Sequence, residues 1–283
     1  MAQIISADMG RSESKFFSLG KKLKFKSIIG DWHERNLSSG GNYDVKIDFG
    51  NGFEKYFIGD LAVSESYLPR SMATESKIHE ESKILFICGT SLLIQEPDII
   101  ISTGLPVNLF KPSIRDELVN LLQGDYIVEF ENCKPKQIHI DQISVSPEGA
   151  GTYFYELKKN PELKQGKVRI LNFGSRTINY LCIESGNFIN RSSGTLNYGS
   201  ILLNNSNMSP KEYCRRILGD LSVKWNDYDE NETVLMSGGG IINLQPFIQK
   251  HFKKTIISDE PIFSDCLGLH EIATTKYGKL VAR

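Results

Sequence analysis

One stretch constrains the fold more than any other, residues 167–183, which read KVRILNFGSRTINYLCI. Apolar, β-branched and aromatic residues on either side of a polar turn over residues 172–177 predict two antiparallel strands. Gly174 permits a backbone conformation that a Cβ atom would hinder, and it lets backbone N–H groups approach an anion. Ser175 and Thr177 add hydroxyl groups. The stretch is therefore either an ordinary β-hairpin or a hairpin whose turn binds phosphate.

A second stretch near the N-terminus follows the same plan. Residues 4–17, IISADMGRSESKFF, again predict a strand, a turn with a glycine and hydroxyl groups, and a return strand. Asp8 takes the place of Asn172, and Lys15 adds a cation that could reach a phosphate. Two such hairpins, one in each half of the chain, predict two lobes that hold a polyphosphate between them.

Three successive glycines, residues 238–240, form a third cluster after a predicted strand over residues 233–235. They precede a helical segment expected over residues 241–252. Bare backbone at a strand-to-helix junction lets a nucleoside lie against it, and a helix N-terminus favours anions.

Helical patterns fill much of the remaining chain. We expect helix within residues 61–95, where residues 84–87 and 92–94 are too apolar for a surface helix. Ser113 is expected to cap another helix, Ser209 to Glu212 form a capping box, and a last helix is expected over residues 262–275. Alternation of strands with buried helices indicates an α/β fold.

In this order, the three glycine-containing segments resemble the phosphate-1, phosphate-2 and adenosine motifs of the actin/Hsp70/sugar-kinase superfamily. The chain is most similar to plasmid-segregating bacterial actins of the ParM and AlfA type. Five further segments, residues 56–62, 102–107, 146–151, 193–199 and 266–269, extend the resemblance over nearly the whole chain.

The resemblance implies an actin-like (ribonuclease H-like) two-lobed α/β fold. Domain I would cover residues 1–145 plus 262–283, with a small subdomain inserted at about 30–80, and domain II would cover residues 146–261. The interval between Asn172 and Gly238 is too short for the extra subdomain of domain II, IIB, so this subdomain is expected to be reduced or absent, as in AlfA-type actins.

The resemblance also implies a nucleotide site for ATP, or GTP, with Mg²⁺. Asp8 matches the acidic residue that holds Mg²⁺ through water, since hard cations prefer carboxylate and phosphate oxygens. The residues expected to bind the nucleotide come from all three motifs and are Asp8, Gly10, Arg11, Ser12, Lys15, Gly174, Ser175, Arg176, Thr177, Gly238, Gly239 and Gly240.

Glu148 and Asn172 are the candidate catalytic residues. Pro147 is expected to start a helix with Glu148 in its first turn, where the carboxylate either complements the helix dipole or, as in ParM-like actins, orients a water near the γ-phosphate. Asn172 departs from the pattern of the superfamily, whose second phosphate loop usually begins with aspartate. An amide cannot act as a base and offers Mg²⁺ no charge. Because hydrolysis depends mostly on positioning and electrostatics, we expect it to be slow rather than absent.

Composition limits the partners. The net charge of −1 implies no bulk attraction to nucleic acid, and the lysine-rich residues 21–26 predict an edge strand with a solvated face. Five cysteines at no metal-binding spacing predict reduced, mostly buried thiols. Without a signal peptide or a long apolar run, we expect a cytoplasmic protein that does not bind membranes.

Three functions are compatible with these features. The first is a filament-forming actin with weak ATPase activity that segregates or positions plasmid DNA, its partners being further copies of itself and a DNA-binding adaptor at the centromere. The second is a small-molecule kinase resembling type III pantothenate kinase, against which Asn172 argues, because that chemistry needs an aspartate. The third is a non-polymerising ATP-binding scaffold.

Overall fold

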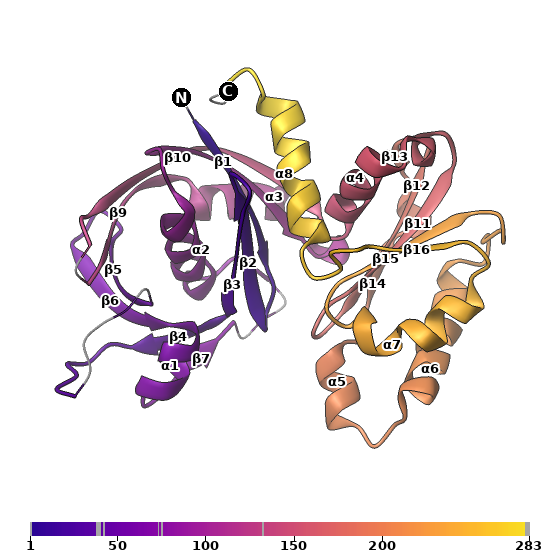
Figure 1. Cartoon of the computed structure of the whole chain (residues 1–283), viewed down its shortest axis with the longest axis horizontal. Coiled ribbons are helices and arrows are strands. Elements are labelled where there is room, and N and C mark those ends of the chain that lie inside the picture. Colours follow the sequence, from indigo (N-terminus) through magenta and orange to yellow (C-terminus); the bar gives the residue numbers. More distant parts are fainter. Residues whose placement is uncertain are drawn as a thin grey trace. The chain divides into compact units, whose positions relative to one another are not determined.

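The computed structural model describes residues 2–37, 41, 43–72, 74, 76–131 and 133–280. The chain divides into two compact units, which are described one at a time (Figure 1). Unit 1 comprises Met1–Gly104, Lys111–Val145 and Ala273–Arg283, and unit 2 comprises Leu105–Phe110 and Ser146–Ile272. This division is by compactness alone, and the expected domain boundaries stay a prediction.

Unit 1 is built on one mixed sheet, whose ten strands in the described residues follow the order β3-β2-β1-β8-β10-β9-β5-β6-β4-β7. The strands are β1 (Gln3–Met9), β2 (Glu13–Ser18), β3 (Lys21–Lys26), β4 (Ile28–Asp31), β5 (Asp44–Asp48), β6 (Phe53–Ile58), β7 (Arg70–Ser71), β8 (Asp98–Leu105), β9 (Gly124–Phe130) and β10 (Lys136–Pro147). β1 pairs antiparallel with β2 and parallel with β8. The lysine-rich strand β3 ends the sheet, which confirms the predicted edge strand.

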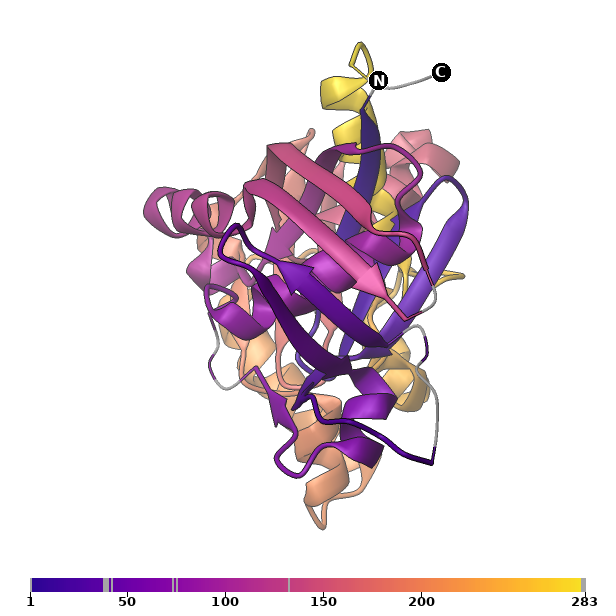
Figure 2. The ribbon, with the colours of Figure 1, turned by 90° about the vertical axis from the view of Figure 1, so that its left-hand side faces the viewer.

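Helix α2 (Glu80–Leu93) forms the centre of unit 1, and the strands curve around it (Figures 1 and 2). Its residues Ile84, Leu85 and Phe86 are buried, as their dense apolar pattern predicts. Phe16 of β2 packs against Phe86 with ring centroids 6.0 Å apart. A Cβ at Gly89 would collide with the Phe16 ring, so this glycine sets how closely α2 approaches β2.

One helix start differs from the prediction. The helical pattern expected within residues 61–95 forms two helices: α1 (Gly59–Glu65) ends before β7, and α2 begins after His79, whose side chain accepts a hydrogen bond from the Ser82 N–H. Helix α3 (Pro112–Leu122) begins at Pro112, with Lys111 as its N-cap, so the assignment of Ser113 as the cap was wrong. Proline is well suited to the first helical position because its missing N–H would have no partner there.

Unit 2 contains a six-stranded sheet in the order β13-β12-β11-β15-β16, with β14 paired to β12. The strands are β11 (Lys167–Phe173), β12 (Ile178–Glu184), β13 (Asn187–Phe188), β14 (Gly194–Leu196), β15 (Thr233–Ser237) and β16 (Thr255–Ile257). Its helices are α4 (Ala150–Lys159), α5 (Ser200–Asn205), α6 (Pro210–Lys224), α7 (Ile241–Ile248) and α8 (Ser264–Tyr277), which runs on into residues of unit 1; the 3₁₀ turns are η1 (Val107–Leu109), η2 (Pro161–Gln165), η3 (Asn190–Ser192) and η4 (Gln249–His251).

The sheet of unit 2 is buried on both faces. Val168 and Ile170 of β11 pack with Tyr153 of α4, whereas Leu171 and Phe173 pack with residues of α6 and α7. Helices on both faces are what a sheet with parallel central strands requires. Residues 174–232, all of which the structure describes, hold β12–β14, η3, α5 and α6 and no second sheet, in agreement with the expected reduction of an extra subdomain. Residues 187–207, which are rich in glycine, serine and asparagine, contain β13, η3, β14 and α5.

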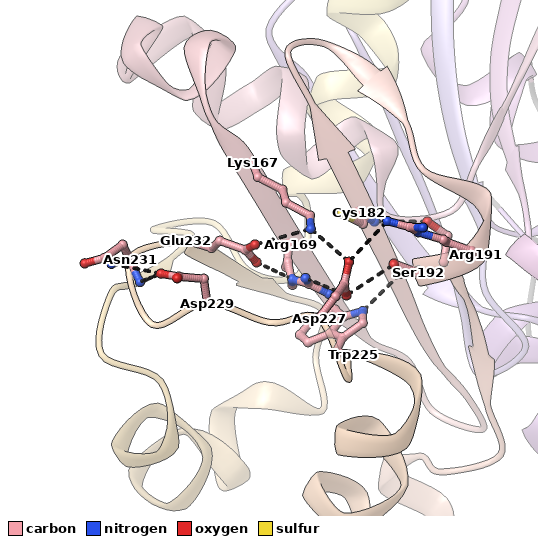
Figure 3. Close-up of polar contacts among 11 residues, drawn as sticks. Lys167, Arg169, Cys182, Arg191, Ser192, Trp225, Asp227, Asp229, Asn231 and Glu232 are labelled. Atoms are coloured by element: carbon pink, nitrogen blue, oxygen red, sulfur yellow. Dashed lines mark hydrogen bonds and ion pairs between the residues drawn. The ribbon is translucent and has the colours of Figure 1, made fainter.

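A buried arginine lies among carboxylates at the side of this sheet (Figure 3). Arg169 of β11 is fully buried; its Nη2 donates to Asp227 Oδ1 at 2.9 Å, and its Nε donates to Glu232. The guanidinium also lies 5.0 Å from the Trp225 ring centroid. Hydrogen bonds from Lys167 and Arg169 hold the pKa of Asp227 well below its usual range. Because a buried cation is costly without partners, this cluster ties β11 to the segment before β15.

We predict that Glu232→Gln lowers the free energy of unfolding by about 3 kcal/mol, because it leaves Arg169 buried with one carboxylate fewer. Glu230→Gln is the matched control: Glu230 pairs with Lys253 at 2.8 Å, but both side chains are 65% exposed. Its loss should cost less than about 1 kcal/mol. Urea unfolding measures the loss of unfolding free energy in both variants. Equal losses would contradict the role of Glu232 as a partner of the buried Arg169.

Candidate functional site

The first predicted phosphate hairpin is formed by β1 and β2, and its polar side chains meet across the two strands. Asp8 and Lys15 are cross-strand partners, with Lys15 Nζ 2.9 Å from Asp8 Oδ2. Burial by itself raises the pKa of Asp8, but the ammonium groups of Lys15 and Lys77 outweigh it, so that the pKa of Asp8 lies below its usual value. The carboxylate is therefore ionised at neutral pH and able to interact with a cation.

The turn of this hairpin contains Gly10, Arg11 and Ser12, as predicted. A Cβ on Gly10 would lie 2.6 Å from the carbonyl oxygen of Glu13, so only glycine fits without a shift of the backbone. Ser27, which lies between β3 and β4, holds this turn in place. Its N–H donates to the Ser12 carbonyl at 3.0 Å, and its hydroxyl donates to the Gly10 carbonyl.

Lys77 is a residue of this region that the sequence did not reveal. It is only 6% exposed, and its Nζ donates to the carbonyl of Gly104 in β8 at 2.9 Å. Its charge contributes to lowering the pKa of Asp8. A single lysine in a polar connection carries no local signal of burial, because the burial arises from the packing of distant strands.

The second hairpin, β11 and β12, repeats the register of the first. Asn172 and Asn179 are cross-strand partners seven residues apart, as are Asp8 and Lys15. The Gly174 N–H donates to the Thr177 carbonyl at 2.8 Å, and a Cβ on Gly174 would lie 2.8 Å from that same oxygen. The predicted residues 174–177 thus form a tight turn.

The start of α5 supports this turn from outside. The Ile201 N–H donates to the Ser175 carbonyl at 2.9 Å, and a Cβ on Gly199 would collide with Ser175 and Arg176. Tyr213 of α6 holds Gly199 through hydrogen bonds of 2.8 Å to both its N–H and its carbonyl. The backbone of the second turn is therefore fixed by two helices.

The third glycine cluster lies directly beside the second turn. β11 and β15 are parallel, with Asn172 opposite Ser237, so both strands end at the same edge of the sheet. Gly238 has φ = 87°, a Cβ on it would collide with the Phe173 carbonyl, and the Gly240 N–H donates to that carbonyl at 3.0 Å. A Cβ on Gly239 would have no atom within 4 Å. The carboxyl ends of parallel strands are where ligands bind in open α/β sheets.

Glu148 does not lie in the first turn of a helix, so the helix-dipole interpretation of this residue was wrong. Pro147 ends β10, Gly149 takes φ = 93°, and α4 begins only at Ala150. Asp265 of α8 supplies the cap: its Oδ1 accepts from the N–H groups of Gly149 and Thr152, both at 3.1 Å. This carboxylate complements the N-terminus of α4 in place of Glu148.

Within unit 2, the structure links Glu148 to the cross-strand partner of Asn172. Glu148 Oε2 accepts a hydrogen bond of 2.6 Å from Nδ2 of Asn179, the cross-strand partner of Asn172. A Cβ on Gly149 would lie 3.4 Å from the Cβ of Asn172. Paired residues of adjacent strands point to the same face of a sheet. Asn179, which sequence reasoning missed, is therefore hydrogen-bonded to Glu148 and lies opposite Asn172 on the neighbouring strand.

Each unit, taken by itself, offers groups that suit one part of a magnesium nucleotide. In unit 2, Gly174 and Gly238 allow tight turns in which a Cβ would collide with neighbouring backbone, and Gly239 beside them has open space where a Cβ would stand. Exposed glycine backbone of this kind suits an anionic and planar ligand. Asp8 offers an ionised carboxylate oxygen, the ligand type that Mg²⁺ prefers. In the described ranges, no three His, Cys, Asp or Glu side chains cluster as a metal site.

Other side chains complete the description of the chain. Cys88, Cys182, Cys214 and Cys266 are buried free thiols and Cys133 is an exposed one, which confirms the expected mostly buried cysteines. Among the described residues, no helix has the length and apolar character needed to cross a membrane.

Comparison with known proteins gives one family match and many similar structures. A family model, the N-terminal domain of actin-like proteins, matches residues 6–151. No curated protein matches the sequence. The chain is similar to the apo psk41 ParM protein (17% identity, 99% of each chain covered, TM-score 0.79). It is also similar to ParM in a 15-stranded filament from Clostridium botulinum (20% identity, 97% of this chain and 99% of that chain, TM-score 0.80).

A third similar structure is the AlfA filament bound to AMPPNP, at 16% identity with 100% of both chains covered and a TM-score of 0.72. At such low identities, the likeness establishes the fold. The actin-like α/β fold that the sequence predicts is thereby confirmed, and it contains two sheets.

We predict that Gly239→Ala weakens ATP binding at least about tenfold without changing the free energy of unfolding, because the added methyl enters open space where the nucleoside is expected. Gly238→Ala should weaken binding and also cost about 1–3 kcal/mol, since it combines a positive φ with a collision. Gly219→Ala in α6, likewise in open space, is the control and should do neither. Titration with a fluorescent ATP analogue measures the affinity, and thermal unfolding measures the stability. Wild-type affinity in Gly239→Ala would contradict the proposed place of the nucleoside at Gly239.

Proposed function

The chain belongs to the family of actin-like proteins, and we propose that it is a nucleotide-dependent filament protein that segregates or positions plasmid DNA through an adaptor. The observation that carries the proposal is the junction of the second turn with the glycine cluster, where Gly240 N–H donates to the Phe173 carbonyl at 3.0 Å. At this junction, the glycine backbone of residues 238–240 could contact a nucleoside, and the neighbouring turn at residues 174–177 could bind phosphate. Its ligand would be ATP, with GTP as the alternative.

In this proposal, each unit would contribute a different chemistry to nucleotide binding. In unit 1, Asp8 would hold Mg²⁺ through water, and Lys15, which pairs with Asp8 at 2.9 Å, is long enough to turn toward a phosphate. Gly10, Arg11 and Ser12 would bind phosphate oxygens through the first turn. In unit 2, the residues 174–177 would do the same through the second turn, and Gly238–Gly240 would contact the nucleoside.

Hydrolysis would depend on Glu148, whose carboxylate accepts a hydrogen bond from Asn179, the cross-strand partner of Asn172. Bound Mg²⁺ supplies positive charge that stabilises the negative charge developing on the phosphates. Glu148 would orient the attacking water and accept its proton. Asn172 adds no negative charge to this group, and slow hydrolysis follows from that.

Filament formation and DNA segregation rest on the family and on its structural neighbours. ParM from Clostridium botulinum and AlfA are both described as filaments. The primary partner would be a second copy of this chain. The net charge of −1 favours indirect contact with centromere DNA, through an adaptor, in the cytoplasm.

Sedimentation at high speed, combined with negative-stain imaging, tests the proposal. We predict filaments with ATP and with a non-hydrolysable ATP analogue, fewer with ADP, and none without nucleotide; GTP measures base preference. Persistent filaments with the analogue and transient ones with ATP would indicate that hydrolysis destabilises the polymer. A nucleotide-bound monomer under every condition would contradict the filament function.

We further predict opposite effects of two substitutions on phosphate release. Glu148→Gln should lower the hydrolysis rate on the order of a hundredfold, because it removes the group that accepts the proton of water. Asn172→Asp should raise the rate about tenfold, because it adds a charge that interacts with Mg²⁺. Glu184→Gln, on the exposed end of β12, is the control and should match the wild type. A wild-type rate in Glu148→Gln would contradict the assigned role of Glu148.

A further inference from the structure

We propose that Asn179 is a positioning residue that orients the carboxylate of Glu148 for hydrolysis. This inference rests on the proposed function, since it names the residue on which the action of Glu148 depends. Asn179 lies on β12 and is only 2% exposed. All of its hydrogen-bond partners described below belong to unit 2.

The orientation of the Asn179 amide is fixed by a group that can only donate. The backbone N–H of Val107 donates to Asn179 Oδ1 at 3.2 Å, so that atom must be the carbonyl oxygen. The Thr195 hydroxyl donates to the same oxygen at 2.7 Å. The amide nitrogen is therefore left facing Glu148, to which it donates at 2.6 Å.

The same segment also holds the backbone of Glu148. The Glu148 N–H donates to the Leu105 carbonyl at 2.8 Å, two residues before Val107. Glu148 is thus tied to residues 105–107 twice, through its own N–H and, by way of Asn179, through its carboxylate. Because Asn179 is buried and its hydrogen bonds are satisfied, its amide has little rotational freedom, and its Nδ2 directs the carboxylate of the half-buried Glu148 before any ligand binds.

Comparison with the first hairpin shows how an amide at position 179 differs in effect from a cation. Lys15 occupies the position in β2 that Asn179 occupies in β12, and its ammonium pairs with Asp8. A cation beside a carboxylate lowers its basicity, which suits a residue that interacts with Mg²⁺. A neutral amide directs a carboxylate with a smaller loss of basicity, which suits a residue that accepts a proton.

Two variants test the proposal. Asn179→Ala removes the donor and should lower kcat at least about tenfold with nucleotide affinity within about twofold of wild type. Asn179→Asp is nearly isosteric and places a second carboxylate against Glu148. Two adjacent carboxylates share a proton, so the acidic limb of the pH–rate profile should move upward by about one pH unit or more.

Asn187→Asp is the matched control, because Asn187 lies exposed on the neighbouring strand β13. Its rate and pH profile should equal those of the wild type. Asn179 acting only as a structural residue would lower activity without moving the pH profile in Asn179→Asp, and that result would overturn the proposal. If Asn179→Ala does not fold, the pH profile of Asn179→Asp decides.

Glu148→Gln, measured in parallel, separates this inference from the proposed function. A slow Glu148→Gln together with wild-type rates and profiles in both Asn179 variants would overturn the positioning role alone. A wild-type rate in Glu148→Gln would overturn the catalytic role of Glu148 and the positioning role with it, whereas nucleotide-dependent filaments would still stand.

Discussion

The candidate nucleotide site depends on the close approach of two backbone segments, at Phe173 and at Gly238–Gly240. The Phe173 carbonyl accepts from the Gly240 N–H at 3.0 Å, and a Cβ on Gly238 would occupy the space that this carbonyl fills. Parallel pairing of β11 with β15 brings the segments to one edge, and α6 and α7 pack beneath them. The pairing of β11 with β15 thus places the candidate phosphate turn directly beside the candidate nucleoside surface.

The two hairpins show how one backbone design carries two chemistries. In both, the side chains that meet across the strands are seven residues apart, with a glycine two residues after the first. In β1–β2 the pair is ionic, Asp8 with Lys15, whereas in β11–β12 it is an amide pair, Asn172 with Asn179. The first suits the charge of Mg²⁺ and phosphate, and the second suits the orientation of a neighbouring base.

The sequence was sufficient for features that depend on local chemistry. The strands around Gly10 and Gly174, the glycine cluster before α7 and the Ser209 cap of α6 all follow from neighbouring residues. The start of α4 was not predictable, because its cap comes from Asp265, which is 116 residues from Gly149. The buried positions of Lys77 and Arg169 and the contacts of Asn179 likewise arise from distant segments. The roles of the site residues stay predictions.

Equilibrium binding of ATP, with and without Mg²⁺, tests the central claim most directly. Isothermal titration of the purified chain should give one site per molecule, with an affinity at least about tenfold higher when Mg²⁺ is present. Asp8→Asn should remove this magnesium dependence and leave binding in the absence of Mg²⁺, because the amide keeps the shape of the carboxylate without its charge. No binding of ATP or GTP under either condition would contradict the account.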